Sequence, residues 1–278
     1  MSAVAEAIAE GRVGERLWLY PNYHCNLRCT YCLTESAPGV ARRLLGPETI
    51  VERVREARTL GFTGVGITGG EPFLLDWMPE LLVELAEILP VIVLSNATLF
   101  TGRRLTALEP LAGLPIHIQI SLDSAEPQVN DEMRGPGNFA KVVAAISELV
   151  RRGIGVRLAT TIEDPASHDA EELERLCELH RSLGVGDEDH VVRPIIRRGR
   201  AATGGMGVPA GAEELEPELT ITADGAFWSP FGPTVRAGAL DTDLLVTRTT
   251  SPLAVAAAAL VRVAGGREAG HDARLGIR

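Results

Sequence analysis

Six short apolar runs alternate with helix-like stretches along the first two thirds of this chain. The apolar runs lie at 17–20, 64–68, 91–95, 116–122, 156–162 and 191–195, and the helix-like stretches at 47–60, 78–89, 101–109, 139–152 and 168–183. Repeated alternation of this kind predicts a parallel sheet covered by helices. Because the runs are almost continuously apolar, we expect both faces of the sheet to be buried.

The number of units limits the choice of fold. Six strand–helix units within the first 195 residues are too few for a complete eightfold barrel, which needs about 250 residues. The sequence therefore predicts an α/β fold, either a partial barrel or an open doubly wound sheet. In both folds, ligands bind at the carboxyl ends of the strands.

The composition changes after about residue 200. A Gly- and Ala-rich stretch at 201–211 reads as a linker. Ala223-Asp224-Gly225 between two apolar runs predicts a hairpin, and Ser251-Pro252 begins an Ala-rich helix. The expected parts are an N-terminal segment at 1–16, the sheet at 17–200, and an extension and tail at 201–278.

Charge and cysteine content exclude several classes of protein. Asp and Glu number 37 against 27 Lys and Arg, which gives a net charge of −10. This acidity argues against a general binder of nucleic acid or of anionic membranes. The sequence has neither an apolar stretch of spanning length nor a basic start typical of a signal peptide, so we expect a cytoplasmic protein.

Three of the four cysteines fall within eight residues, directly after the first predicted strand. Cys25, Cys29 and Cys32 have CxxxCxxC spacing, and a loop of this length can curl around a metal centre. A zinc ion would need a fourth ligand, but His24 is too close in sequence and Cys177 lies far along the chain. A [4Fe–4S] cluster held by three cysteines leaves one iron open to a small molecule.

With Tyr31 just before the third cysteine, this segment resembles the signature of the radical S-adenosylmethionine (radical SAM) superfamily. The resemblance covers roughly residues 17–195 and agrees with a partial (β/α)6 TIM-like barrel. It implies that Cys25, Cys29 and Cys32 bind a [4Fe–4S] cluster. It further implies that the open iron chelates S-adenosylmethionine (SAM) and that Tyr31 packs near the adenine.

The second apolar run ends in Gly69, Gly70, Glu71 and Pro72, which resembles the GGEP motif of that family. A glycine pair allows close approach of the backbone to a ligand. The resemblance implies that the motif holds the methionyl amine of SAM, and a carboxylate beside it can accept hydrogen bonds from a cation. The alternative is a simple turn before a helix.

The third run ends in Ser95, Asn96 and Ala97, where the family usually has Gly in place of Ala97. The resemblance implies that Ser95 or Asn96 faces the cofactor. Equally, Asn96 could only cap the helix expected near Thr101.

The fourth run places Gln119, Ser121 and Asp123 on one face of a strand. Ser121 and Asp123 resemble the family's SLD segment, whose Ser and Asp approach the cofactor. In the following stretch, the resemblance makes Arg134 the candidate partner of the SAM carboxylate. A solvated loop arginine is the alternative.

The tail resembles the family's SPASM/twitch branch but has no cysteine after Cys177, and Ser229 stands where one is expected. We therefore expect a degenerate, cluster-free extension that covers the barrel or shapes the substrate pocket. Four arginines at 193, 197, 198 and 200 could attract an anion, although such a run is more often a solvated face.

These observations predict a radical SAM enzyme that reductively cleaves SAM and abstracts hydrogen from a carbon of a small-molecule substrate in a specialised biosynthetic pathway. The alternatives are a peptide (RiPP) maturase and a non-enzymatic iron–sulfur or metal-binding protein. The expected partners are the substrate and an external electron donor of the flavodoxin or ferredoxin type, with no nucleic acid and no membrane. No catalytic residue beyond the cofactor ligands is assigned, and Cys177 is not expected to act as a hydrogen donor.

Overall fold

The computed structural model of the protein describes residues 2–163, 170–265 and 275. Its main sheet has nine strands in the order β11-β8-β7-β1-β2-β3-β4-β5-β6. The six predicted strands lie next to one another and pair in parallel: β1 (Arg16–Asn22), β2 (Gly64–Gly69), β3 (Val91–Ser95), β4 (Ile116–Ser121), β5 (Gly155–Ile162) and β6 (His190–Pro194). The predicted α/β fold class is confirmed.

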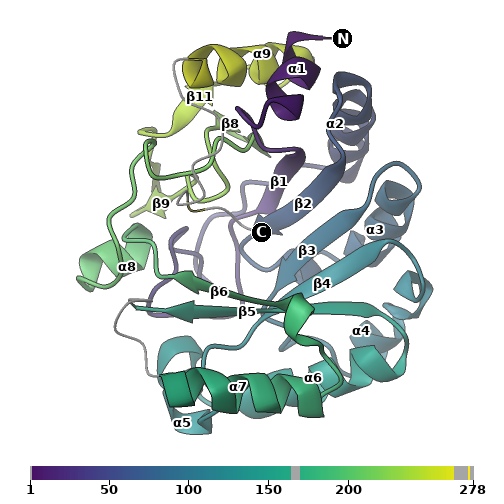
Figure 1. Cartoon of the computed structure of the whole chain (residues 1–278), viewed down its shortest axis with the longest axis vertical. Coiled ribbons are helices and arrows are strands. Elements are labelled where there is room, and N and C mark those ends of the chain that lie inside the picture. The colour runs from purple at the N-terminus through teal and green to yellow at the C-terminus, as the bar shows by residue number, and fades with distance from the viewer. Residues whose placement is uncertain (1, 164–169, 266–274, 276–278) are drawn as a thin grey trace.

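Within the described residues the sheet does not close, because β6 pairs only with β5. It is therefore an open, partial TIM-like arrangement. The predicted helices are α2 (Pro47–Leu60), α3 (Met78–Ala86), α4 (Gly102–Thr106), α6 (Asn138–Arg151) and α7 (Ala170–Ser182). They run along one outer side of the sheet (Figure 1). Strands β1 to β5 are largely buried, as their apolar character predicts. Strand β6 lies at the edge of the sheet and is only half-buried, with Val192 exposed, so the expectation of two buried faces is wrong for this strand.

Three helices lie where the sequence does not predict any. They are α1 (Ala3–Ala9), α5 (Pro127–Arg134) and α8 (Gly199–Thr203). Helix α5 turns Asn130 and Arg134 inward, so its buried side is polar and lacks an apolar period. Helix α8 overlaps the stretch expected to be a linker, and that expectation is wrong for residues 201–203.

The tail joins the main sheet. Strands β7 (Thr220–Thr222) and β8 (Gly225–Phe227) form the predicted hairpin, and β7 pairs in parallel with β1. Strand β11 (Leu245–Thr247) pairs with β8, and α9 (Leu253–Ala264) packs beside α1 (Figure 1). A separate ribbon consists of β9 (Val235–Arg236) and β10 (Ala239–Leu240). Of the final eight residues, only Leu275 is among those described.

No helix in the described part of the chain has the length and apolar character needed to cross a membrane.

Candidate active site

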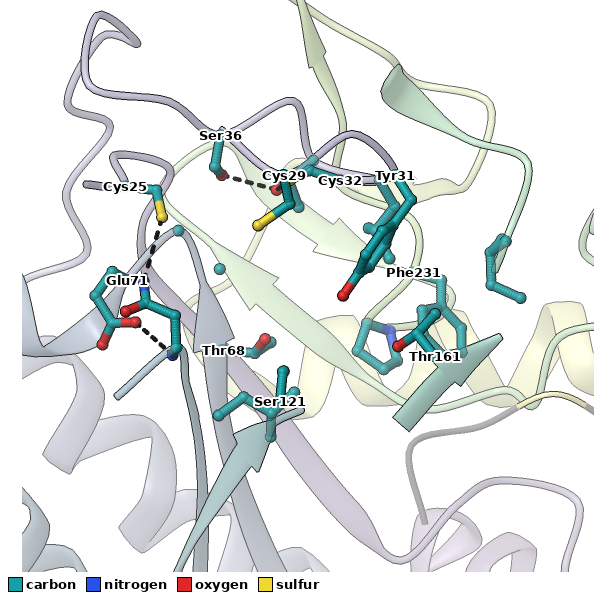
Figure 2. A pocket seen from close by; sticks show the side chains of 18 of the residues that line it. Cys25, Cys29, Tyr31, Cys32, Ser36, Thr68, Glu71, Ser121, Thr161 and Phe231 are labelled. Atoms are coloured by element: carbon teal, nitrogen blue, oxygen red, sulfur yellow. Dashed lines mark hydrogen bonds between the residues drawn. The ribbon is translucent and has the colours of Figure 1, made fainter. Parts of the chain in front are cut away.

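A cavity opens at the carboxyl ends of the parallel strands, where the fold predicts ligand binding. The space that it encloses, with its open mouth and the adjoining solvent included, is about 940 Å³. The cysteines lie along one side, with Glu71 and Ser121 across from them (Figure 2). The predicted residues that line it are Cys25, Cys29, Tyr31, Cys32, Gly69, Gly70, Glu71, Ser95, Asn96, Ser121 and Arg134.

The glycine pair of the second strand supports the cysteine loop. Gly70 N donates to Asn22 O at 3.0 Å, and Glu71 N donates to His24 O at 2.8 Å. A Cβ on Gly70 would lie only 2.0 Å from His24 O, so a side chain there would push the loop away. Both glycines line the cavity, but the close approach that they permit is to the protein's own backbone.

The tail holds the same loop from the other side. Arg200 donates from Nε to Cys29 O at 2.8 Å and from Nη2 to Ser36 O at 2.5 Å, while its amide donates to Cys32 O at 3.0 Å. Thr234 Oγ1 donates to Leu33 O at 2.8 Å. The loop that carries the cysteines is therefore fixed by residues about 170–200 positions later in the chain.

Two thiols of this loop, those of Cys25 and Cys29, resist ionisation in the absence of a metal. Burial, with a smaller contribution from the Glu71 carboxylate, raises the pKa of Cys25 to about 12. Burial also raises the pKa of Cys29 to about 11, although Arg134 opposes the rise. Free thiols of this kind are protonated at neutral pH and make poor nucleophiles, whereas metal binding displaces the proton.

The arrangement fits a cluster better than a single ion. Among the described residues, no three His, Cys, Asp or Glu side chains are arranged to hold one metal ion. Cysteine ligands of one zinc ion must all lie about 2.3 Å from it, whereas the cysteines of a [4Fe–4S] cluster bind separate irons and can stand farther apart. Three cysteines on one cavity wall meet the second requirement.

Glu71 is buried and already accepts three hydrogen bonds. Its Oε1 accepts from Phe73 N at 3.1 Å and Ser95 Oγ at 2.9 Å, and its Oε2 accepts from Asn96 N at 2.8 Å. Burial raises its pKa to about 7, and these donors oppose the rise. The carboxylate is thus oriented at the cavity wall, where a cationic amine would favour its ionised form.

Asn96 connects the third strand to the cysteine loop. Its Nδ2 donates to Asn26 Oδ1 at 3.0 Å and lies 3.7 Å from Cys25 Sγ. Ala97 follows with φ of 56°, a left-handed conformation that favours Gly. Asn96 does not cap α4, whose N-cap is Thr101, so the capping alternative is wrong. The unusual Ala97 keeps the backbone shape that Gly would adopt.

The side chain of Arg134 already forms hydrogen bonds with two other side chains of the protein. Its Nε donates to Asp123 Oδ2 at 2.5 Å and its Nη2 donates to Tyr31 Oη, while Tyr31 Oη also donates to Asp123 Oδ2 at 2.6 Å. The alternative of a solvated loop arginine is wrong, because Arg134 is buried at the end of α5. Asp123 does not line the cavity and instead fixes Arg134 and Tyr31 from behind its wall.

Two further predicted residues also lie away from the cavity wall. Pro72 is buried and does not line the cavity. It begins the short 3-10 helix Pro72–Leu74, which follows β2. Gln119 is buried within the sheet and does not reach the cavity.

Sequence reasoning singled out Arg193 only as part of a run of arginines that could attract an anion, and it missed several other lining residues, including Tyr20, Thr68, Thr161, Pro194 and Phe231. Thr68, Thr161 and Pro194 stand near the carboxyl ends of their strands, so the position rule for this fold could have found them. Phe231 comes from the tail and has no such signal.

A comparison with protein families decides the family. The model described as "Radical SAM superfamily" matches residues 19–179, more than half of the chain. The chain belongs to the radical SAM superfamily. Members bind a [4Fe–4S] cluster and SAM, and the chain is an enzyme of this family.

Curated relatives share the same portion of the chain. A PqqA peptide cyclase from Ruegeria pomeroyi is 33% identical over 59% of this chain and 43% of its own length. A GTP 3′,8-cyclase from Aquifex aeolicus is 31% identical over 58% of this chain and 51% of its own. The matches thus span about half the length of these radical SAM relatives.

Solved structures agree on the fold. Streptococcus suis SuiB bound to S-adenosylmethionine superposes with a TM-score of 0.57 at 19% identity, covering 68% of this chain and 43% of SuiB. The structure titled "Native anSMEcpe with bound AdoMet" gives a TM-score of 0.56 at 14% identity, covering 78% of this chain and 74% of that one. At these identities the likeness concerns the fold alone.

Proposed function

We propose that this radical SAM enzyme binds a [4Fe–4S] cluster through Cys25, Cys29 and Cys32, and SAM between the cluster and Glu71. The single observation that carries the proposal is that these four side chains line one cavity at the strand ends. When bound, the cluster and SAM supply reductive cleavage to methionine and a 5′-deoxyadenosyl radical that abstracts hydrogen from a substrate carbon.

The chain's own residues are proposed to bind and orient SAM and to exclude water from the cavity. The Glu71 carboxylate is oriented by Ser95 and Asn96 to accept hydrogen bonds from the methionyl amine. Arg134 has one guanidinium nitrogen, Nη1, beyond those that bond Asp123 and Tyr31, and this nitrogen is proposed to meet the SAM carboxylate. Buried walls keep water from a reactive radical.

We further propose a small-molecule substrate. The tail narrows the cavity, since Pro230 and Phe231 form part of its wall and Tyr20 Oη donates to Pro230 O. This wall limits the space on one side of the proposed SAM position, which suits a compact substrate. A flavodoxin- or ferredoxin-type protein is the proposed electron donor.

A peptide substrate is the second candidate. It is favoured by the similarity to a PqqA peptide cyclase and by the fold shared with SuiB, which has been solved bound to the precursor peptide SuiA. The cavity has an open mouth through which a peptide segment could enter.

The test of the cofactor proposal is anaerobic reconstitution followed by reduction with dithionite in the presence of SAM. We expect about four irons per chain and formation of 5′-deoxyadenosine and methionine. Replacing Cys25, Cys29 or Cys32 by Ala should abolish both. Cys177→Ala is the matched control, because Cys177 lies on α7 outside the cavity. About eight irons, or loss of the cluster in Cys177→Ala, would contradict the assignment.

The substrate class is tested with a dialysable cell extract added to the loaded enzyme. A small-molecule substrate should accelerate 5′-deoxyadenosine formation, and digestion of the extract with peptidases should leave the acceleration intact. Loss of the acceleration on digestion would favour the peptide candidate.

A further inference from the structure

The four arginines at and after the end of β6 differ in what they contact. Arg197 donates from Nε and Nη2 to Gly207 O at 2.9 and 2.6 Å. Arg198 forms a paired contact with Asp243, in which both N–O distances are 2.7 Å. Arg200 bonds the cysteine loop. Three of the four therefore have structural partners, and only Arg193 remains.

Within the described residues, Arg193 has no hydrogen-bond acceptor and no acidic partner, and its Nη1 is buried without one. Burial lowers its pKa, which the nearby Tyr31 and Asp123 oppose. Asp123 is not available to it as a direct partner, because that carboxylate already bonds Arg134 and Tyr31. A shielded cation in this state gains from any anion that can reach it.

The position of Arg193 makes that anion a ligand. Arg193 lines the cavity, and in the sheet it is the register partner of Thr161 on β5. Its guanidinium carbon lies 6.0 Å from the centre of the Phe231 ring, at the outer limit of a cation–π contact. Thr161 and Phe231 lie on the opposite side of the cavity from Glu71 (Figure 2).

We propose that Arg193 binds an oxyanion of the substrate, either a carboxylate or a phosphate. The inference rests on the proposed function and adds the substrate class, an anionic molecule anchored where β5 and β6 end. A guanidinium suits this task because its planar fork can hold two oxygens of a carboxylate or phosphate together. With Glu71 across the cavity, the anchored molecule would extend toward the cofactor position.

The probes are acetate and inorganic phosphate, titrated by calorimetry into the anaerobic, cluster-loaded protein. SAM is kept saturating so that its own carboxylate subsite is filled, and uncharged acetamide is the negative probe. We expect saturable binding of at least one anion and none of acetamide. The preferred anion distinguishes a carboxylate substrate from a phosphorylated one.

Arg193→Gln should weaken the binding of that anion about ten-fold to a hundred-fold, as expected when a charge-assisted hydrogen bond is lost. The anion affinity of Arg193→Lys should lie between those of the wild type and Arg193→Gln, because lysine keeps the charge but lacks the planar guanidinium. Arg197→Gln is the matched control, since it removes the same charge from an exposed side chain of the same run, and it should bind as the wild type does.

Three results would overturn the inference: no saturable anion binding by the wild type, equal binding by Arg193→Gln and the wild type, or a loss of SAM affinity in Arg193→Gln as large as the loss for the anion. The last would assign the guanidinium to the cofactor. Formation of 5′-deoxyadenosine by the wild type, measured in parallel, tests the proposed cofactor site separately from the anion subsite at Arg193. Cleavage of SAM without anion binding would refute only the anion subsite.

Discussion

The guanidinium of Arg200 donates to the main-chain oxygen of Cys29 at 2.8 Å, although the two residues are 171 positions apart. A second bond from the same side chain reaches Ser36 O. The loop proposed to hold the cluster is therefore supported by Arg200, which follows the last of the six predicted strands in sequence. Hydrogen bonds from charged groups typically contribute about 1.5–3 kcal/mol.

We predict that Arg200→Gln increases the rate at which the loaded protein loses iron to a chelator. Opening of the loop should become about ten-fold to a hundred-fold more frequent, as followed by the visible absorbance of the cluster. Arg197→Gln removes a nearby guanidinium that donates to Gly207 O and, within the described residues, not to the cysteine loop, so it should leave the rate unchanged. Equal rates in all three proteins would show that Arg200 does not support the loop.

Glu71→Gln should weaken SAM binding about ten-fold to a hundred-fold while the iron content stays the same, because it removes the charge that faces the amine. Affinity can be measured by anaerobic calorimetry. Glu80→Gln, an exposed change on α3, is the control. Unchanged affinity in Glu71→Gln would remove Glu71 from the SAM site.

Glu71→Ala is expected to have a second effect. It leaves Ser95 Oγ and the amides of Phe73 and Asn96 without their acceptor. Unsatisfied buried donors cost about 1–3 kcal/mol, so this variant should also unfold at lower denaturant concentration than Glu71→Gln. Identical stabilities would show that these donors find other partners.

Ala97 lies at φ of 56° and is 1% exposed. Ala97→Gly removes strain of about 1–2 kcal/mol but also a buried methyl group that contributes about 0.8 kcal/mol. The unfolding free energy should therefore stay within about 1 kcal/mol of the wild type. Ala97→Val adds volume and a β-branch in the left-handed region, and should cost about 1–3 kcal/mol. A stable Val variant would refute this backbone geometry.

His180 gives the protein a specific sensitivity to acid. Its ring is buried against His190, with centroids 4.2 Å apart, and neither nitrogen has a partner within the described residues. Burial, aided by His190, lowers its pKa to about 3 from 6.5. Below pH 6.5 the His180 imidazole binds a proton in the unfolded chain but stays neutral in the folded chain. The free energy of unfolding therefore falls as pH falls toward 3.

The expected slope is at most about 1.4 kcal/mol per pH unit for this one proton, or about 2 kcal/mol between pH 6.5 and 5. Denaturant unfolding at several pH values measures it. His180→Leu should flatten this part of the profile, whereas His117→Gln, an exposed change, should not. A profile of His180→Leu that follows the wild type would show that His180 does not cause the loss.

The parallel strands and the residues near the cysteines were predictable because their signals are local. Buried strands are apolar along their whole length, and the cysteines, the glycine pair and Glu71 each occupy a short segment at a strand end. Helix α5 was missed because its inward residues Asn130 and Arg134 are polar. The roles of Arg200 and Phe231 were missed because contacts between distant segments leave no periodicity in the sequence.

The pairing of β7 with β1 has a consequence for the order of folding. The first strand of the sheet receives its second neighbour only through Thr220 and Ile221, about 200 residues later. During synthesis, β1 can pair with β2 early, but its other edge stays unpaired until those residues have emerged. Contacts of such long sequence separation form late, and Arg200 and Thr234 reach the cysteine loop from the same late part of the chain. Stable insertion of the cluster is therefore expected to follow, and not precede, completion of the sheet.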